Sequence, residues 1–166
     1  MNSIDEIRML PKIFDTEITE DYLDQYGHMN VRWYATLWGR GAGGFMASLG
    51  LDFRDAVKRE RGNWVLRQVI DYNAEVLGGD VVAIHGRMIE HSDKCMHNMY
   101  WMINETRQKI ASTCEVLVGY ADLNERRLTS FPPELVEEFD TKIHGWNALD
   151  WEPQTSGAIA LTRPKQ

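Results

Sequence analysis

The residues whose types and spacing could do chemistry lie in segment 24–30, where Asp24, His28 and Asn30 surround Gly27. The run that follows reads as a helix, so an acid, an imidazole and an amide stand in front of a helix start. The N-terminus of a helix carries unsatisfied N–H groups and a partial positive charge. Such an arrangement suits acyl transfer, because the carboxylate can take a proton from water while the helix N–H groups bind the developing oxyanion.

Each of these residues also has a purely structural interpretation. A loop aspartate such as Asp24 can hold its own turn through backbone hydrogen bonds, and His28 can be satisfied by the loop backbone. Asn30 fits the N-cap of the following helix. The cap would still serve a site, because it fixes the N–H groups of the first turn.

The helix expected over residues 30–49 has to position this loop, and Gly50 fits its C-terminal stop. At helical spacing, one face collects Tyr34, Trp38, Ala42 and Phe45. Glycine inside a helix costs about 1 kcal/mol relative to alanine, and this helix has glycine at positions 39, 41, 43 and 44. Two interpretations stay open: another backbone approaches closely, or the helix breaks near Gly43.

The rest of the chain is rich in strand patterns separated by short polar turns. Strands are expected over 12–19, 64–72, 81–90, 96–105 and 110–123, and short helices over 53–59 and 134–141. In the segment 96–105, Met99, Trp101 and Ile103 alternate with Asn98, Tyr100 and Asn104. The order of one strand, a long helix and then a run of antiparallel strands predicts an α+β fold with one sheet packed on one helix.

Length and composition set the remaining bounds. With 166 residues and 43% hydrophobic content, the chain is expected to form a single domain over 1–143, followed by an extension over 144–166 that is an extended arm or partly disordered. The net charge of −7 argues against nucleic acid as a partner. Secretory and membrane-spanning segments are not expected. Cys95 and Cys114 form neither a disulfide framework nor a metal-ligand spacing, so we expect a reduced, cytoplasmic protein.

Several of these segments carry a family resemblance. The pattern Asp24-x-x-Gly27-His28-Met29-Asn30, followed by Trp33-Tyr34, resembles the signature loop of hotdog-fold acyl-CoA thioesterases of the 4-hydroxybenzoyl-CoA thioesterase-like branch. Segments 72–80 and 124–132 are similar to later parts of that family. The loop departs from the common pattern at Val31, where a second asparagine is usual, and at the bulkier residues Arg32 and Trp33.

The resemblance implies a hotdog fold, in which an antiparallel sheet wraps around one long central helix. It assigns Asp24 the role of general base or nucleophile, and it allows His28 to orient the thioester carbonyl or Asp24. Asn30 caps the helix, and the backbone N–H near Val31 belongs to the oxyanion hole. The substrate is an acyl-CoA, so coenzyme A is part of the substrate, and neither a metal nor a separate cofactor is needed. The assembly is a homodimer or homotetramer with sites at the subunit interface.

Several questions stay open from the sequence. The acyl group is not identified, and Trp33 and Trp64 either line an aromatic pocket or belong to the core or an interface. Basic residues that could meet the phosphates of coenzyme A, without an assigned site, are Arg87, Lys94, Arg107, Lys109, Arg126 and Arg127. Alternative functions are a hotdog enoyl-CoA hydratase or dehydratase, and a non-catalytic acyl-CoA-binding module.

Overall fold

The strand-like segments of the chain pair into one antiparallel sheet. The computed structural model describes residues 2–161. Its strands are β1 (Lys12–Glu17), β2 (Arg61–Tyr72), β3 (Val81–His91), β4 (Cys95–Asn104), β5 (Lys109–Asp122) and the short β6 (Arg127–Leu128). The order across the sheet is β1-β3-β4-β5-β2, and β6 pairs with the far end of β5. The predicted strands are therefore confirmed, with ends shifted by up to three residues.

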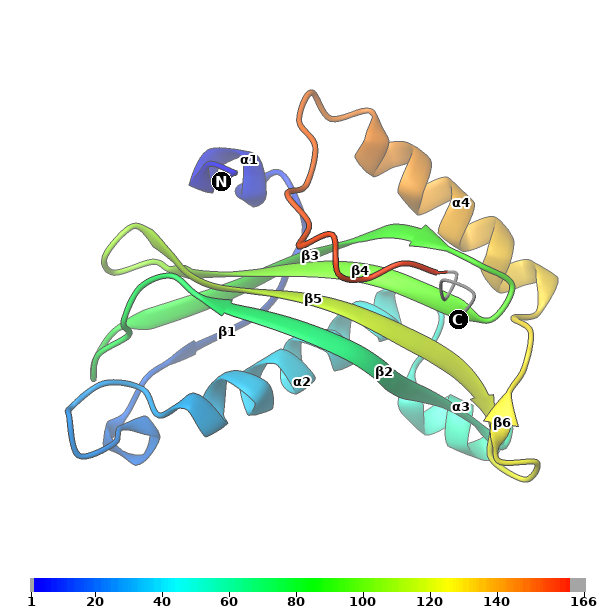
Figure 1. Cartoon of the computed structure of the whole chain (residues 1–166), viewed down its shortest axis with the longest axis horizontal. Helices are drawn as coiled ribbons and strands as arrows, with labels where there is room; N and C mark the ends of the chain where they lie inside the picture. The colour runs from blue at the N-terminus through cyan, green and yellow to red at the C-terminus, as the bar shows by residue number, and fades with distance from the viewer. Residues whose placement is uncertain (1, 162–166) are drawn as a thin grey trace.

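One long helix fills the inner face of this curved sheet, as Figure 1 shows. The helix α2 (Val31–Ser48) buries Tyr34, Trp38 and Phe45, as its apolar spacing predicted. Asn30 caps its N-terminus, and Gly50 follows its end with a φ of +77°. The short helix α3 (Phe53–Lys58) comes next in the chain. This arrangement confirms the α+β hotdog fold that the sequence and the resemblance implied.

The glycines of α2 divide into two groups, and the helix is unbroken. A Cβ atom on Gly41 would lie 3.2 Å from the Ile84 side chain, and one on Gly44 would lie 3.0 Å from the carbonyl oxygen of Ile13. The predicted close approach of another backbone is therefore confirmed at Gly44, and Gly41 makes room for the Ile84 side chain of the sheet. Gly39 and Gly43 have no neighbour within 4 Å of such an atom, so close packing does not explain them.

The outer face of the sheet is covered by the two ends of the chain. The helix α1 (Ile4–Arg8), which the sequence reading missed, packs there with residues 148–161 (Figure 1). Trp151 is buried, and its ring lies edge-on to Trp101 at 5.9 Å. The segment 148–161 is thus a packed extended arm rather than a disordered end over the residues described.

The last helix, α4 (Pro133–Asn147), is longer than the predicted 134–141. It continues past Gly145 because Trp146, near its end, packs against the hydrophobic clusters on both the inner and the outer face of the sheet. The helix therefore crosses the predicted division at residues 143 and 144, and that division stays a prediction.

The strand β2 forms an open edge of the sheet. Within residues 2–161 it pairs with β5 alone, along almost its whole length. Val65 and Leu66 near its middle and Tyr72 at its end are exposed apolar or aromatic side chains. A long edge strand with exposed apolar residues has unpaired backbone N–H and C=O groups that can pair with a strand of another chain.

Candidate active site

The loop before α2 is closed by its own backbone hydrogen bonds. The N–H of Asp24 donates to the carbonyl of His28 at 3.0 Å, and the N–H of Gly27 donates to the carbonyl of Asp24 at 3.1 Å. Gly27 adopts a φ of +82°, which a residue with a Cβ rarely does. The spacing of Asp24, Gly27 and His28 therefore makes a tight turn that returns the chain to the helix start.

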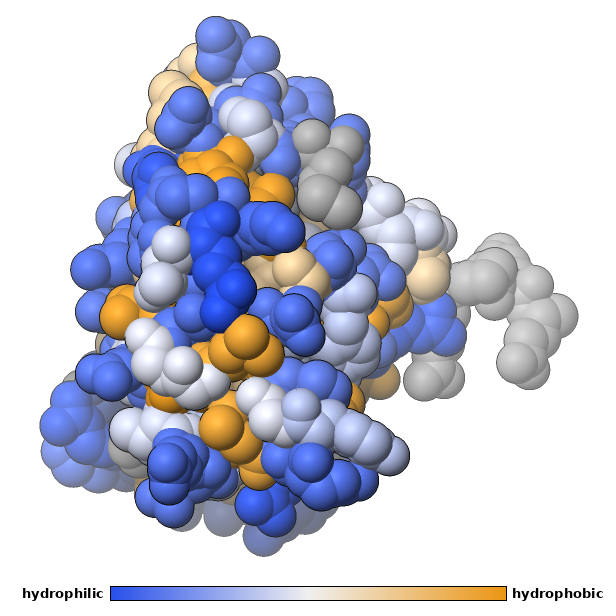
Figure 2. Space-filling model, turned by 90° about the vertical axis from the view of Figure 1, so that its left-hand side faces the viewer, coloured by the Kyte–Doolittle hydropathy of each residue, from blue (hydrophilic) through white to orange (hydrophobic). Residues whose placement is uncertain are grey.

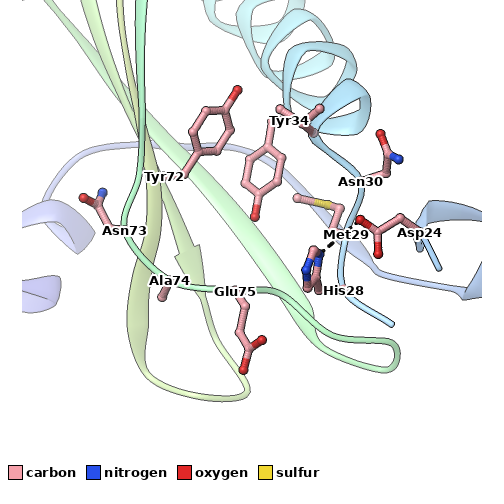
Figure 3. A pocket seen from close by; sticks show the side chains of 10 residues that line it. Asp24, His28, Met29, Asn30, Tyr34, Tyr72, Asn73, Ala74 and Glu75 are labelled. Carbon is pink, nitrogen blue, oxygen red and sulfur yellow. Dashed lines mark ion pairs between the residues drawn. The ribbon is translucent and has the colours of Figure 1, made fainter. Parts of the chain in front are cut away.

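This turn places the Asp24 carboxylate beside the His28 imidazole (Figure 3). The Oδ2 atom of Asp24 lies 3.4 Å from Nδ1 of His28, and Oδ1 accepts a hydrogen bond from the N–H of Tyr26 at 2.8 Å. The Asp24 side chain is 13% exposed, so it is mostly shielded but still reachable. One carboxylate oxygen, Oδ1, therefore stabilises the turn, while the other, Oδ2, stays available for chemistry.

The helix N-terminus adjoins this pair and keeps one donor free. The Oδ1 atom of Asn30 accepts from the N–H of Arg32 at 3.1 Å, and the carbonyl of Asn30 accepts from the N–H of Trp33 at 2.9 Å. The N–H of Val31 has no acceptor among the residues that the structure describes. The cap therefore leaves Val31 as the unpaired donor of the first turn.

These four predicted residues meet in one pocket of about 430 Å³. Its lining consists of Asp24, His28, Met29, Asn30, Val31, Tyr34, Tyr72, Asn73, Ala74 and Glu75. Figure 2 looks onto this end of the molecule, where hydrophilic residues predominate and apolar ones show between them in small groups. The structure thus brings together every residue that the sequence proposed for the site.

The opposite wall comes from the end of β2, and sequence spacing did not assign it to the site. Residues 72–75 reach the pocket because the N–H of Met29 donates to the carbonyl of Val76 at 2.7 Å. The rings of Tyr34 and Tyr72 meet edge to face with centroids 4.9 Å apart. Burial, with a smaller contribution from Tyr72, raises the pKa of Tyr34 to about 12, so its hydroxyl stays protonated. The only sequence signal for this wall was the family-like segment 72–76.

Among residues 2–161, the pocket is lined by two carboxylates, Asp24 and Glu75, and by no lysine or arginine. None of the basic residues considered for coenzyme A lines it. Arg87 is buried on the outer face, where it donates to the carbonyl of Trp146, and Arg107 pairs with Asp80 at 2.8 Å. Trp33 and Trp64 do not line it either. Apart from the His28 imidazole, its aromatic rings are those of the two tyrosines.

His85, His91 and His97, which lie on strands outside the loop, have structural partners. His85 is buried and bonds the carbonyl of Leu10, and His97 lies 2.8 Å from the buried carboxylate of Glu115. Burial lowers the pKa of His85. Over residues 2–161, no cluster of three or more His, Cys, Asp or Glu side chains could hold a metal ion. In the same part of the chain, no helix combines the length and apolar character needed to cross a membrane.

Comparison with known proteins decides the family. The sequence model described as the thioesterase-like superfamily matches residues 18–139, which include the loop, α2 and the whole sheet from β2 to β5. The chain belongs to the thioesterase-like superfamily. No curated protein sequence matches this superfamily member significantly.

Solved structures share the fold of this thioesterase-like protein at low sequence identity. A Staphylococcus aureus protein, solved in complex with CoA, has a TM-score of 0.76 and 21% identity, with 93% of this chain and 97% of that chain covered. The DHNA-CoA thioesterase of Staphylococcus aureus has a TM-score of 0.73 and 17% identity, with 82% and 92% covered. Slr0204 from Synechocystis, a 1,4-dihydroxy-2-naphthoyl-CoA thioesterase, has a TM-score of 0.68 and 12% identity, with 82% and 97% covered.

Proposed function

We propose that this protein hydrolyses acyl-CoA thioesters at the pocket between Asp24 and the N-terminus of α2. The observation that carries the proposal is the pairing of a shielded carboxylate, on Asp24, with the unpaired N–H of Val31 in one pocket. Membership of the thioesterase-like superfamily supports the same reaction class.

The reaction follows from the two groups. Asp24 takes a proton from a water molecule while the water oxygen attacks the thioester carbonyl carbon, and the carbonyl oxygen becomes an oxyanion that the Val31 N–H stabilises. The tetrahedral intermediate then collapses, the carbon–sulfur bond breaks, and the coenzyme A thiolate leaves and is protonated. Asp24 can instead attack the carbonyl itself and form an anhydride that water hydrolyses. His28 holds the carboxylate in either case.

Coenzyme A as the carrier is supported by the structures that share the fold. One of them was solved with CoA, and two others are described as CoA thioesterases. The enoyl-CoA hydratase alternative has less support, because the Asp-x-Asn-Pro-x-His pattern of hotdog hydratases is missing from the loop. The free, buried thiols of Cys95 and Cys114 fit a reducing compartment such as the cytoplasm.

A second copy of the chain completes the proposed assembly. The open edge of β2 ends at Tyr72, which lines the pocket, so a copy paired along this edge would border the site. Symmetric pairing of identical edges is the commonest way to close such an interface. We therefore include a homodimer in the proposal, and a homotetramer would arise from two such dimers.

The test is release of free thiol from a panel of short, branched, aromatic and cationic acyl-CoAs. Asp24→Asn should lower kcat on the best substrate by about 100-fold or more, the range of general-base contributions. Asp21→Asn, in the same acidic loop but exposed, is the matched control and should keep the wild-type rate. Full activity of Asp24→Asn would refute the assignment of Asp24. Loss of an enoyl-CoA double bond without thiol release would favour the hydratase, and tight acyl-CoA binding without turnover would favour a binding module.

A further inference from the structure

Tyr34 carries a hydroxyl group that has no partner in the part of the chain that the structure describes. The residue is 5% exposed, and its hydroxyl neither donates to nor accepts from any group within residues 2–161. The side chain lines the pocket at the start of α2. Polar groups in protein interiors nearly always have a partner. The hydroxyl must therefore bind water or a ligand in the pocket.

The direction of this side chain follows from its place on α2. Aromatic side chains on a helix lean back toward the N-terminus, over the residues three and four positions earlier. For Tyr34 those residues are Val31, the first residue of the helix, and Asn30, its cap. The ring therefore leans toward the end of the helix where the unpaired N–H of Val31 lies.

Figure 3 shows where the hydroxyl points. The Tyr34 hydroxyl is directed into the space beside His28 and Glu75. The Tyr72 hydroxyl and the Asn73 amide, on the opposite wall, point away from that space. Tyr34 is thus the neutral side chain that presents a donor to the region next to the catalytic loop.

The oxyanion of the proposed reaction calls for more than one donor. Sites of acyl transfer usually offer two donors to this oxygen, which bears several lone pairs. In the first turn of α2, the N–H groups of Arg32 and Trp33 donate to the cap, and Val31 supplies one unpaired N–H. The second donor must therefore come from a side chain that faces the pocket.

The protonation state of Tyr34 suits this role. Burial, and to a smaller extent Tyr72, raises its pKa to about 12, so the hydroxyl keeps its proton throughout the neutral pH range. A thiol is a much stronger acid, with a pKa of about 8.5 for cysteine. Proton transfer from Tyr34 to the departing coenzyme A thiolate would be uphill, so solvent supplies that proton. The hydroxyl can therefore donate a hydrogen bond without giving up its hydrogen.

We propose that Tyr34 is a catalytic residue, whose hydroxyl donates the second hydrogen bond to the oxyanion beside the N–H of Val31. The inference rests on the proposed thioesterase function and adds a catalytic group to it. When the nucleophile attacks the carbonyl carbon, an electron pair of the C=O bond moves onto the oxygen, and both donors stabilise its charge. When the carbon–sulfur bond breaks, the C=O bond forms again, the thiolate leaves with the electron pair of the broken bond, and Tyr34 still holds its proton.

The test is Tyr34→Phe, which removes one oxygen atom and keeps the ring. On the best substrate of the acyl-CoA panel, kcat should fall by about 100-fold with a smaller change in KM, because loss of one oxyanion donor costs rate rather than binding. The thioether analogue of that substrate, with CH2 in place of the carbonyl, should bind both proteins with similar Kd. Between about pH 5 and pH 9 the profile of kcat/KM should keep its shape, because a group that does not titrate there is lost.

Tyr120→Phe is the matched control. This tyrosine is 6% exposed, and its ring packs on that of Phe131 with centroids 4.9 Å apart. It lies at the other end of β5 from Ser112, which pairs with Tyr72 beside the pocket. Its replacement removes the same atom from a similarly buried ring and should leave kcat near the wild-type value. Tyr34→Phe should keep the wild-type melting temperature, because its hydroxyl has no partner within residues 2–161 to lose.

The outcomes separate the two proposals. If the wild type releases thiol and Tyr34→Phe keeps its kcat, the role of the hydroxyl is overturned and the proposed function stands. A lower kcat together with weaker binding of the thioether, or with a lowered melting temperature, would mean that the hydroxyl only supports the pocket, which also overturns it. Loss of one limb of the pH profile in Tyr34→Phe would make the hydroxyl a proton donor and overturn it as well. No thiol release by the wild type from any acyl-CoA would overturn the proposed function itself.

Discussion

The Nδ1 atom of His28 lies 3.4 Å from the Oδ2 atom of Asp24, four residues earlier in the chain. The other Asp24 oxygen is held by the N–H of Tyr26. The carboxylate is therefore fixed from both sides, by a backbone donor and by an imidazole. A base or nucleophile works best when its position is set before the substrate arrives.

The first prediction concerns this positioning by His28. His28→Ala removes the donor beside Oδ2, and we expect kcat to fall by about 10- to 100-fold, with a smaller change in KM, because a misplaced base costs rate more than binding. His28→Gln retains a hydrogen-bond donor and should recover part of the loss. Steady-state thiol release measures both variants. Equal defects in His28→Gln and His28→Ala would show that the donor is not what matters.

A second prediction uses the neighbouring glycines of α2. Gly43→Ala adds a methyl group in open space and should raise the free energy of unfolding by about 0.5–1 kcal/mol through helix propensity alone. Gly44→Ala would place a Cβ atom 3.0 Å from the carbonyl oxygen of Ile13, so β1 would have to move, and stability should fall. Denaturant unfolding of the two variants tests the pair. A gain in stability for Gly44→Ala would contradict the close contact.

The ends and glycines of α2 show which features of the helix could be predicted from neighbouring residues and which could not. The Asn30 cap and the Gly50 stop were readable because both act within one turn of their own helix. Which of the four glycines meets the sheet depends on the angle at which α2 crosses it, and no local pattern contains that angle. The helix α1 was missed although Ser3 and Glu6 form a capping box, because five residues give little apolar period.

Part of the candidate site could likewise be predicted from local sequence, and part could not. The loop with Asp24 and His28 was readable because its chemistry lies within one turn. The wall at Tyr72 was not, since it arrives through the pairing of distant segments. The alternation of β4 was predicted, but its direction was not. Both faces of β4 are buried, because the C-terminal arm covers the outer one, so hydrophobicity alone could not choose the inner face.

A third prediction is the pH dependence conferred by Asp80. This buried carboxylate bonds the N–H of Leu77, the Asn104 amide and the Arg107 guanidinium. Burial by itself raises the pKa of Asp80, but these hydrogen bonds outweigh it, and the pKa lies below its ordinary value of 3.8. The ionised form is therefore favoured by folding, so its contribution is full well above pH 4 and is lost as the pH falls through the folded pKa.

The variant that isolates this effect is Asp80→Asn. It should lower the free energy of unfolding at pH 7 by about 2 kcal/mol, since it removes the ionic acceptor while Arg107 stays partly in solvent. The difference from wild type should begin to shrink below about pH 4, where Asp80 of the unfolded wild type becomes protonated, and it should continue to shrink as the pH falls through the lowered folded pKa. Denaturant unfolding at pH 7 and pH 3 measures it. A difference that grows on acidification would reverse the sign of the argument.

A fourth prediction concerns the C-terminal arm. Trp151 is 7% exposed, meets Trp101 edge to face and lies 5.8 Å from the Arg87 guanidinium. Trp151→Ala should lower the free energy of unfolding by about 3 kcal/mol, the usual cost of emptying a buried aromatic site. Trp151→Phe should cost less. The arm lies on the outer face, away from the pocket, so kcat measured well below the melting temperature should stay near the wild-type value.

The last prediction tests the open edge of β2. Two copies related by a two-fold axis perpendicular to the sheet would pair this edge antiparallel to itself, which brings the start of one β2 beside the pocket at the end of the other. Leu66, 44% exposed near the middle of the edge, would then lie close to the axis.

Leu66→Lys would bring two like charges together there, so the dimer should dissociate, and thiol release should fall with it because each pocket loses a wall. The control is Met9→Lys at the end of α1, which changes an apolar residue with 56% exposure next to β3, away from this edge, and should keep the assembly intact. Light scattering after size-exclusion chromatography gives the mass of each variant. A Leu66→Lys protein that kept both the wild-type mass and activity would place the interface elsewhere.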